Sequence, residues 1–264
     1  MLIESPDGFA EASPVDSTLD HNPMQPPHPP GLTAAERHEA EALLAARCER
    51  RQTFAPGEVI ARQGDASDGL HRVDHGAVNF LRIDRTGQSI LFHVGLPGFW
   101  YGVGEHRALG GSRKPLHVVA ASEVRLSSIG ADAVDEIIAS HDVVRRYMMS
   151  VLVNRYATLL DLVETGLKSN PEARLATRLL GFARLNTVPG PLPRTMEIPV
   201  LQATLSALTG VSRQTVNRAL RLLVAAGAVQ SVYGGVRIVD FRRLAEIAGV
   251  GADPFTGRDQ GEGA

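Results

Sequence analysis

A group of arginine and amide side chains between residues 213 and 221 has the clearest chemistry in this sequence. If this segment is a helix, successive side chains turn by about 100°, and one apolar arc is formed by Val216, Ala219, Leu220 and Leu223. The opposite face then carries Arg213, Gln214, Asn217, Arg218 and Arg221. Guanidinium and amide groups make the paired hydrogen bonds that distinguish guanine and adenine in the major groove. The spacing therefore predicts a helix that reads double-stranded DNA.

The flanking residues predict the frame that positions this helix. Ser212 is a favourable N-cap, and the tight turn before it comes from residues 209–211. The preceding helix should have an apolar face of Leu201, Leu205 and Leu208. Gly227 and two short strands at 229–232 and 236–239, joined at residues 233–235, predict a hairpin. Helix, turn, helix and hairpin together indicate a winged helix-turn-helix over residues 170–247.

The charge distribution supports the same interpretation. Residues 171–247 hold ten arginines, no lysine and four acidic residues, a net charge of +6, whereas the whole chain carries −2. A basic module on an acidic chain is typical of phosphate binding. An arginine-rich face that is merely solvated is the alternative for a single helix, but it leaves the turn, the cap and the hairpin unexplained.

Length and composition limit the number of domains and the types of site that this chain can form. A chain of 264 residues suggests about two domains, and 44% hydrophobic and 21% charged residues are ordinary for a globular protein. The single cysteine, Cys48, excludes an internal disulfide, a cysteine-only zinc site and a self-supplied iron–sulfur cluster. Neither a transmembrane stretch nor a signal-peptide pattern appears, so we expect a cytoplasmic protein without a membrane partner. The proline-rich segment 1–32 and the glycine-rich segment 248–264 should be flexible tails.

Residues 33–130 should form one β-rich domain. Thr33 and Glu36 make a capping box for a helix that runs to about Arg51. From residue 53 to 129 short apolar runs alternate with glycine and Asx turns, which predicts a sandwich, barrel or roll.

A long helical region over residues 131–169 should carry the dimer contact. Its apolar residues recur in 4-3-4-3-4 spacing, the seam of a coiled coil: Met149, Val153, Tyr156, Leu160, Val163 and Leu167. A neighbouring stripe contains Met148, Leu152, Leu159 and Leu162. We predict a homodimer; burial of the helix within one chain is the alternative. Asn170 then caps a new helix over 171–184 that starts with proline.

With these elements in place, the sequence resembles the Crp/Fnr superfamily of bacterial transcription regulators. Residues 210–220, with Gly227 and Asp240 behind them, resemble its helix-turn-helix, and residues 54–60, 63–65, 70–78 and 96–98 resemble its effector domain. The resemblance covers about residues 36–247 and implies an α+β fold: a jelly-roll-like β-roll, a long dimerisation helix and a winged helix-turn-helix. It also implies a homodimer on a palindromic operator, with RNA polymerase as a further candidate partner.

The resemblance assigns roles on the recognition helix. Ser212 and Thr215 match positions that contact phosphate, and Arg213, Gln214 and Arg218 match positions that read bases. Many members have glutamate where this chain has Gln214. Glutamate accepts a hydrogen bond from cytosine whereas glutamine pairs with adenine, so we expect a different preferred base pair there.

The effector pocket of the family matches poorly. Members that bind cyclic AMP have Gly-Glu followed nine residues later by Arg-Ser. Alignment from residues 118–120 gives Gly104-Glu105 and Lys114-Pro115, whereas alignment from residues 96–98 puts Gly102-Val103 at the Gly-Glu position, and neither retains Arg-Ser. Lys114 attracts phosphate without a bidentate fork. The adenine-contacting pair of the family falls on Leu159 and Leu160, which cannot hydrogen-bond a purine.

These differences predict a regulator controlled by an effector other than cyclic AMP, or by none. A cyclic-nucleotide regulator with a divergent pocket, and a ligand-sensing module that acts on a protein partner, are the alternatives. We predict no metal site and no cofactor, although haem or another small effector stays open.

Satisfied or solvated side chains account most simply for the histidines of the roll: His71, His75, His93, His106 and His117. The Phe99-Trp100-Tyr101 cluster should be core, with a hydrophobic ligand pocket as the alternative. Catalytic motifs such as a Walker loop or Gly-x-Ser-x-Gly are absent from the sequence, so we expect no enzyme.

Overall fold

The computed structural model describes residues 32–87, 89–166, 170–186 and 194–249. Helix α1 (Ala34–Ala46) begins at the predicted capping box: Thr33 Oγ1 accepts a 3.2 Å hydrogen bond from the Glu36 N–H, and the Glu36 carboxylate accepts one of 2.8 Å from the Thr33 N–H. The expected end near Arg51 is wrong. Residues Arg50–Phe54 instead form strand β1, because they pair in register with strand β8 (Val124–Gly130).

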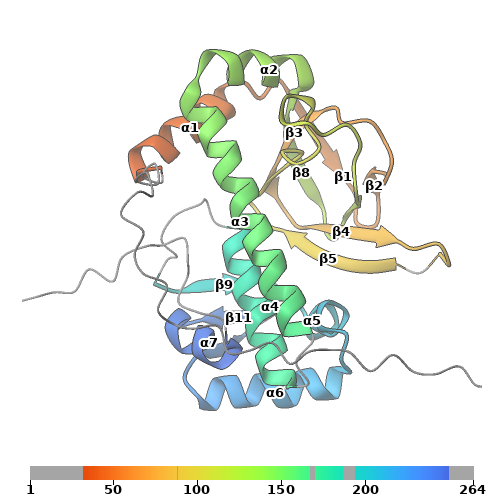
Figure 1. Ribbon diagram of the computed structural model, residues 1–264. Coiled ribbons are helices and arrows are strands. Elements are labelled where there is room, and N and C mark those ends of the chain that lie inside the picture. The colour runs from red at the N-terminus through yellow and green to blue at the C-terminus, as the bar shows by residue number, and fades with distance from the viewer. Residues whose placement is uncertain (1–31, 88, 167–169, 187–193, 250–264) are drawn as a thin grey trace, which may run out of the picture. The chain divides into compact units, whose positions relative to one another are not determined.

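Two antiparallel four-stranded sheets make the predicted roll (Figure 1). The first has the order β1-β8-β3-β6, with β3 (Gly69–His75) and β6 (Trp100–Tyr101). The second has the order β2-β7-β4-β5, with β2 (Val59–Ala61), β7 (His117–Ala120), β4 (Val78–Ile83) and β5 (Ser89–Gly95). An apolar core of residues from both sheets includes Val73, Leu126, Val78 and Phe80.

Glycine is required where β3 turns into β4. Gly76 has a φ of +79°, and a Cβ there would lie 2.0 Å from the carbonyl oxygen of Glu123. Any side chain would therefore separate this turn from the start of β8.

The long helical region consists of two helices, α2 (Ala131–Ser140) and α3 (Asp142–Gly166), with a one-turn 3-10 helix η1 (Arg107–Leu109) before them in the chain. The predicted continuous helix is interrupted at His141, whose backbone is extended. Helix α3 packs beside α1 (Figure 1), where Arg146 pairs with Glu36 at 2.7 Å and Tyr147 donates to Glu41 at 3.0 Å. Met148 of α3 is fully buried in an apolar cluster that includes Ala40 and Leu44 of α1.

The C-terminal module consists of α4 (Pro171–Asn186), β9 (Met196–Ile198), α5 (Gln202–Thr209), α6 (Arg213–Ala225), β10 (Val229–Val232), β11 (Gly235–Ile238) and α7 (Phe241–Ala248). Asn170 caps α4 as predicted, since its Oδ1 accepts from the Glu172 N–H at 2.9 Å. The predicted end at Arg184 is two residues short. Strand β9, which pairs with β11, and helix α7 are additions to the predicted elements.

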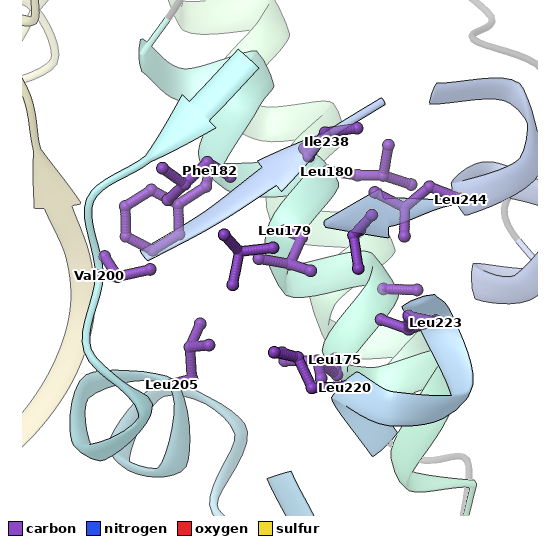
Figure 2. Close-up of a cluster of buried hydrophobic side chains, with 14 of the residues drawn as sticks. Leu175, Leu179, Leu180, Phe182, Val200, Leu205, Leu220, Leu223, Ile238 and Leu244 are labelled. Atoms are coloured by element: carbon purple, nitrogen blue, oxygen red, sulfur yellow. The ribbon is translucent and has the colours of Figure 1, made fainter. Parts of the chain in front are cut away.

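The helices of this module surround one apolar core. Figure 2 shows Leu175 and Leu179 of α4 facing Leu205 of α5 and Leu223 of α6. The placement of Leu201 in that core is wrong. Leu201 is the N-cap of α5 and is 64% exposed, because the helix begins only at the next residue.

Candidate functional site

Helix α6 is positioned by the turn that precedes it. Gly210 ends α5 in a left-handed conformation, with a φ of +67°. Ser212 is the N-cap of α6, as predicted, and its Oγ accepts a 3.2 Å hydrogen bond from the Thr215 N–H. The Ser212 and Thr215 hydroxyl oxygens lie 2.9 Å apart, so both are at the N-terminus of α6. Free N–H groups at a helix N-terminus attract phosphate.

The two faces of α6 differ as the sequence predicts. Val216, Ala219, Leu220 and Leu223 are buried in the apolar core. Arg213, Gln214, Arg218 and Arg221 are exposed, while Thr215 and Asn217 are half-buried. Among the described residues, none of these three arginines is held in an ion pair. Their charges are therefore available to an anionic partner.

Two further exposed side chains of this module have no assigned role from the sequence. Tyr233, between β10 and β11, is fully exposed, and Arg194 is exposed just before β9. The only signal for Tyr233 is an aromatic residue directly before Gly234-Gly235 at a hairpin turn. Both side chains belong to the same module as α6.

The apolar seam of α3 is exposed in the single chain. Met149, Val153, Tyr156, Leu160 and Val163 have exposed fractions between 42% and 63%, and Leu167 lies outside the described residues. The side chains of the neighbouring stripe differ more in their exposure to solvent. Met148 is buried and Leu152 packs against the same cluster, whereas Leu159 is 49% exposed.

A cavity of about 400 Å³ lies where the roll meets α3 and α4. Its wall includes Phe80, Phe92 and Tyr101 from the roll, Leu152, Arg155 and Leu159 from α3, and Arg178 from α4. Of the predicted effector residues, Gly104, Glu105 and Leu159 line it, but Lys114 and Leu160 do not.

Lys114 is instead neutralised by a neighbouring carboxylate. Its side chain is 7% exposed and its Nζ lies 2.5 Å from Asp68 Oδ1, which is also 2.9 Å from His71 Nε2. Burial raises the pKa of the Asp68 carboxyl, but the hydrogen bonds from His71 and Lys114 outweigh it and hold that pKa well below its usual range. Lys114 therefore has its charge balanced within the chain.

The aromatic cluster is buried, as predicted. Phe99, Trp100 and Tyr101 are between 4% and 6% exposed, which confirms them as core. Phe99 and Tyr101 also line the cavity, together with half-buried His93. In the part of the chain that the structure describes, no three His, Cys, Asp or Glu side chains are grouped to hold a metal ion.

Comparison with known proteins agrees with this architecture. Residues 51–141 match the model of the cyclic nucleotide-binding domain, and residues 173–247 match the Crp-like helix-turn-helix domain. The chain is 30% identical over 210 residues to the cyclic AMP receptor protein of Thermus thermophilus, covering 79% of this chain and 92% of that one. It is 27% identical over 202 residues to the transcriptional regulator SdrP of the same organism, covering 74% and 93%. The solved structure of FixK2 from Bradyrhizobium japonicum superimposes with a TM-score of 0.60 at 18% identity, covering 77% of this chain and 98% of that one, which supports the fold.

A β-roll followed by a long helix and a winged helix-turn-helix defines a class of DNA-binding regulators. The chain belongs to the Crp/Fnr superfamily of transcription regulators, as the sequence resemblance implied. Its relatives are regulators rather than enzymes. None of the helices in the described ranges is long and apolar enough to cross a membrane.

Proposed function

We propose that this regulator is a homodimer that reads a palindromic operator and is controlled by an effector other than cyclic AMP, or by none. The exposed face of α6 carries the proposal, because its arginines have no ion-pair partner among the described residues. The proposed domains are a sensor over 33–130, a dimerisation region over 131–169 and a DNA-binding module over 170–247. We place the protein in the cytoplasm, with RNA polymerase as a further partner.

The proposed contacts follow from the geometry of α6. Ser212 and Thr215 bind backbone phosphate at the N-terminus of the helix. The base edges are read by Arg213, Gln214, Asn217, Arg218 and Arg221, which extend from one face. In a symmetric dimer the two α6 helices read half-sites about 34–36 Å apart, one turn of DNA.

The exposed seam of α3 supports the dimer. Five apolar side chains in coiled-coil spacing are exposed to between 42% and 63%, and such a stripe is typical of an interface with another helix. A second copy of α3 offers a self-complementary surface, as a two-fold dimer requires.

The surroundings of the cavity argue against cyclic AMP. At the position where the resemblance places the partner of the cyclic phosphate, Lys114 is paired with Asp68 and does not line the cavity. Pro115 lines the cavity without an N–H, and Leu159 offers no hydrogen bond to a purine.

Selection of duplex DNA from a random pool tests this proposal. The purified full chain is used at fixed salt, with and without cyclic AMP. We expect the same palindrome from both selections. Recovery only with cyclic AMP would overturn the effector part, and no enriched duplex under either condition would overturn the DNA-binding part.

The alternative of a module that acts on a protein partner makes an opposite prediction. In that case DNA binding is weak and indifferent to the loss of Arg213 and Arg218. Our proposal expects each of these substitutions to weaken binding to the selected palindrome.

A further inference from the structure

The cavity between the roll, α3 and α4 combines an apolar wall with two arginines. Arg155 comes from α3 and Arg178 from α4. Most of the remaining lining is aromatic or aliphatic and includes Phe80, Phe92, Phe99, Leu116, Leu152 and Leu162. A cavity of about 400 Å³ is large enough for a small organic ligand.

Neither arginine is neutralised by a described carboxylate. Arg155 donates a hydrogen bond to the Trp100 carbonyl and lies 4.9 Å from the centre of the Phe99 ring. Arg178 has neither a hydrogen bond nor an ion pair within the described residues. Glu105 also lines the cavity but forms no ion pair with either guanidinium.

Burial makes these unpaired charges costly. It lowers the pKa of Arg155 to about 10, although the charge of Glu105 acts in the opposite direction. Burial, with the charge of Arg174, also lowers the pKa of Arg178. Both side chains are half-buried. Because a partly desolvated cation without a counter-charge destabilises a protein, an anionic ligand would compensate both arginines.

The two guanidinium groups act on the same neighbour. Burial first, then the charges of Arg155 and Arg178, lower the pKa of the His93 imidazole to about 3. His93 lines the cavity and is therefore neutral at physiological pH. Arg155, Arg178 and His93 all line this one cavity, and His93 adds no competing charge.

A buried hydroxyl provides a second, independent sign of a missing ligand. Tyr101 is 4% exposed and lines the cavity, yet its hydroxyl oxygen has no hydrogen-bond partner among the described residues. Burial and the charges of Asp68 and Glu105 raise the pKa of this phenol, which keeps it a donor. Buried polar atoms without a partner are rare in folded proteins.

We propose that the cavity binds an apolar carboxylic acid, with its carboxylate held by Arg155 and Arg178 and its hydrocarbon or aromatic part against the phenylalanine and leucine side chains. A guanidinium matches a carboxylate with two parallel hydrogen bonds.

The position of the two arginines connects this ligand to regulation. Arg155 belongs to the helix that carries the proposed dimer seam, and Arg178 belongs to the first helix of the DNA-binding module. A carboxylate that holds both favours the arrangement in which α3 and α4 are close, and it shifts the population towards that state. This regulatory step rests on the proposed function, whereas binding of the acid does not.

Calorimetry on the full chain without DNA tests binding of the acid directly. The probes are decanoate and 4-phenylbutyrate, each compared with its alcohol of the same carbon skeleton, with acetate and cyclic AMP as further comparisons. We expect at least one of the two acids to bind at least about tenfold more tightly than its alcohol and than acetate. Equal binding of acid and alcohol, or no binding of either acid at millimolar concentration, would overturn the proposal.

Two variants locate the site. Arg178→Gln should weaken binding of the acid at least about tenfold, while Arg194→Gln, an exposed arginine of the same module, should leave it unchanged. Because Arg178 has no partner to lose among the residues that the structure describes, R178Q should fold with an unchanged or higher melting temperature. Unchanged acid binding by folded R178Q would place the ligand elsewhere and refute the assignment.

Operator affinity with and without the bound acid then tests regulation. A change in affinity for wild type that is absent in R178Q supports the coupling. If the acid binds but operator affinity stays the same, the regulatory step fails while the binding site stands. If no duplex is bound at all, the proposed function fails independently of the calorimetry.

Discussion

Asn186, the last residue of α4, is hydrogen-bonded to the backbone of the β-roll next to Leu96. Its Oδ1 accepts a 2.8 Å hydrogen bond from the Leu96 N–H, and its Nδ2 donates to the Val94 carbonyl at 3.2 Å. Val94 and Leu96 are 3% and 5% exposed and belong to the same apolar cluster as the core of α4. The DNA-binding module is thus joined to β5 by both polar and apolar contacts.

Asn186→Ala should destabilise this junction. The Leu96 N–H and the Val94 carbonyl would lose their partner while they stay buried, which costs about 1–3 kcal/mol of unfolding free energy. Urea denaturation measures the loss, with Gln52→Ala on the exposed strand β1 as the control. Equal stability of the two variants would show that the side-chain hydrogen bonds of Asn186 contribute nothing.

His93 should make the stability of the protein depend on pH. Burial and the nearby Arg155 and Arg178 lower its folded-state pKa from 6.5 to about 3. The unfolded chain therefore binds the proton more tightly, and the contribution of neutral His93, complete above pH 6.5, is lost as the pH falls towards about 3. His93→Gln should lose less stability than wild type between pH 6.5 and about pH 4.

The exposed His75 provides the matched control for that measurement. His75→Gln should follow the wild-type curve of unfolding free energy against pH. Parallel curves for H93Q and wild type would mean that the folded protein does not keep His93 neutral.

How much the sequence predicts depends on the range of the interactions. The two faces of α6 follow from helical periodicity, so Val216 and Arg218 could be placed without any tertiary information. Strand β1 could not, because Arg50–Phe54 has no apolar alternation and forms a strand only by pairing with β8. Arg178 likewise has no local signature, since the cavity arises only where α4 meets the roll and α3.

A single acidic substitution in the seam should dissociate the dimer. Val163 is 57% exposed in the single chain, so Val163→Glu leaves the fold of the protomer intact but places a charge in the proposed interface. Sedimentation should show a monomer, together with loss of binding to a palindrome. Ile83→Glu makes the same change at a side chain that is 40% exposed on β4 and should stay dimeric. A dimeric V163E would exclude this seam as the contact.

Arg218→Ala should weaken operator binding by about 1–3 kcal/mol and relax specificity at one base pair, because a bidentate contact to a base is lost. Arg82→Ala, which removes the same charge from the exposed part of β4, should leave affinity nearly unchanged. Competition titrations against operators mutated one base pair at a time measure both effects. If R218A weakened binding equally on every sequence, Arg218 would be a phosphate contact instead.

The sharpest test of the recognition helix is Gln214→Glu. Gln214 is exposed near the N-terminus of α6, in line with its predicted base-reading role. Its amide both donates and accepts, which suits adenine, whereas a glutamate carboxylate only accepts and suits the amino group of cytosine. Random-pool selection with Q214E should therefore recover a palindrome changed at one base pair in each half-site and the same elsewhere. An unchanged palindrome would remove Gln214 from the base-reading set, while the assignments of Arg213 and Arg218 would still rest on their own substitutions.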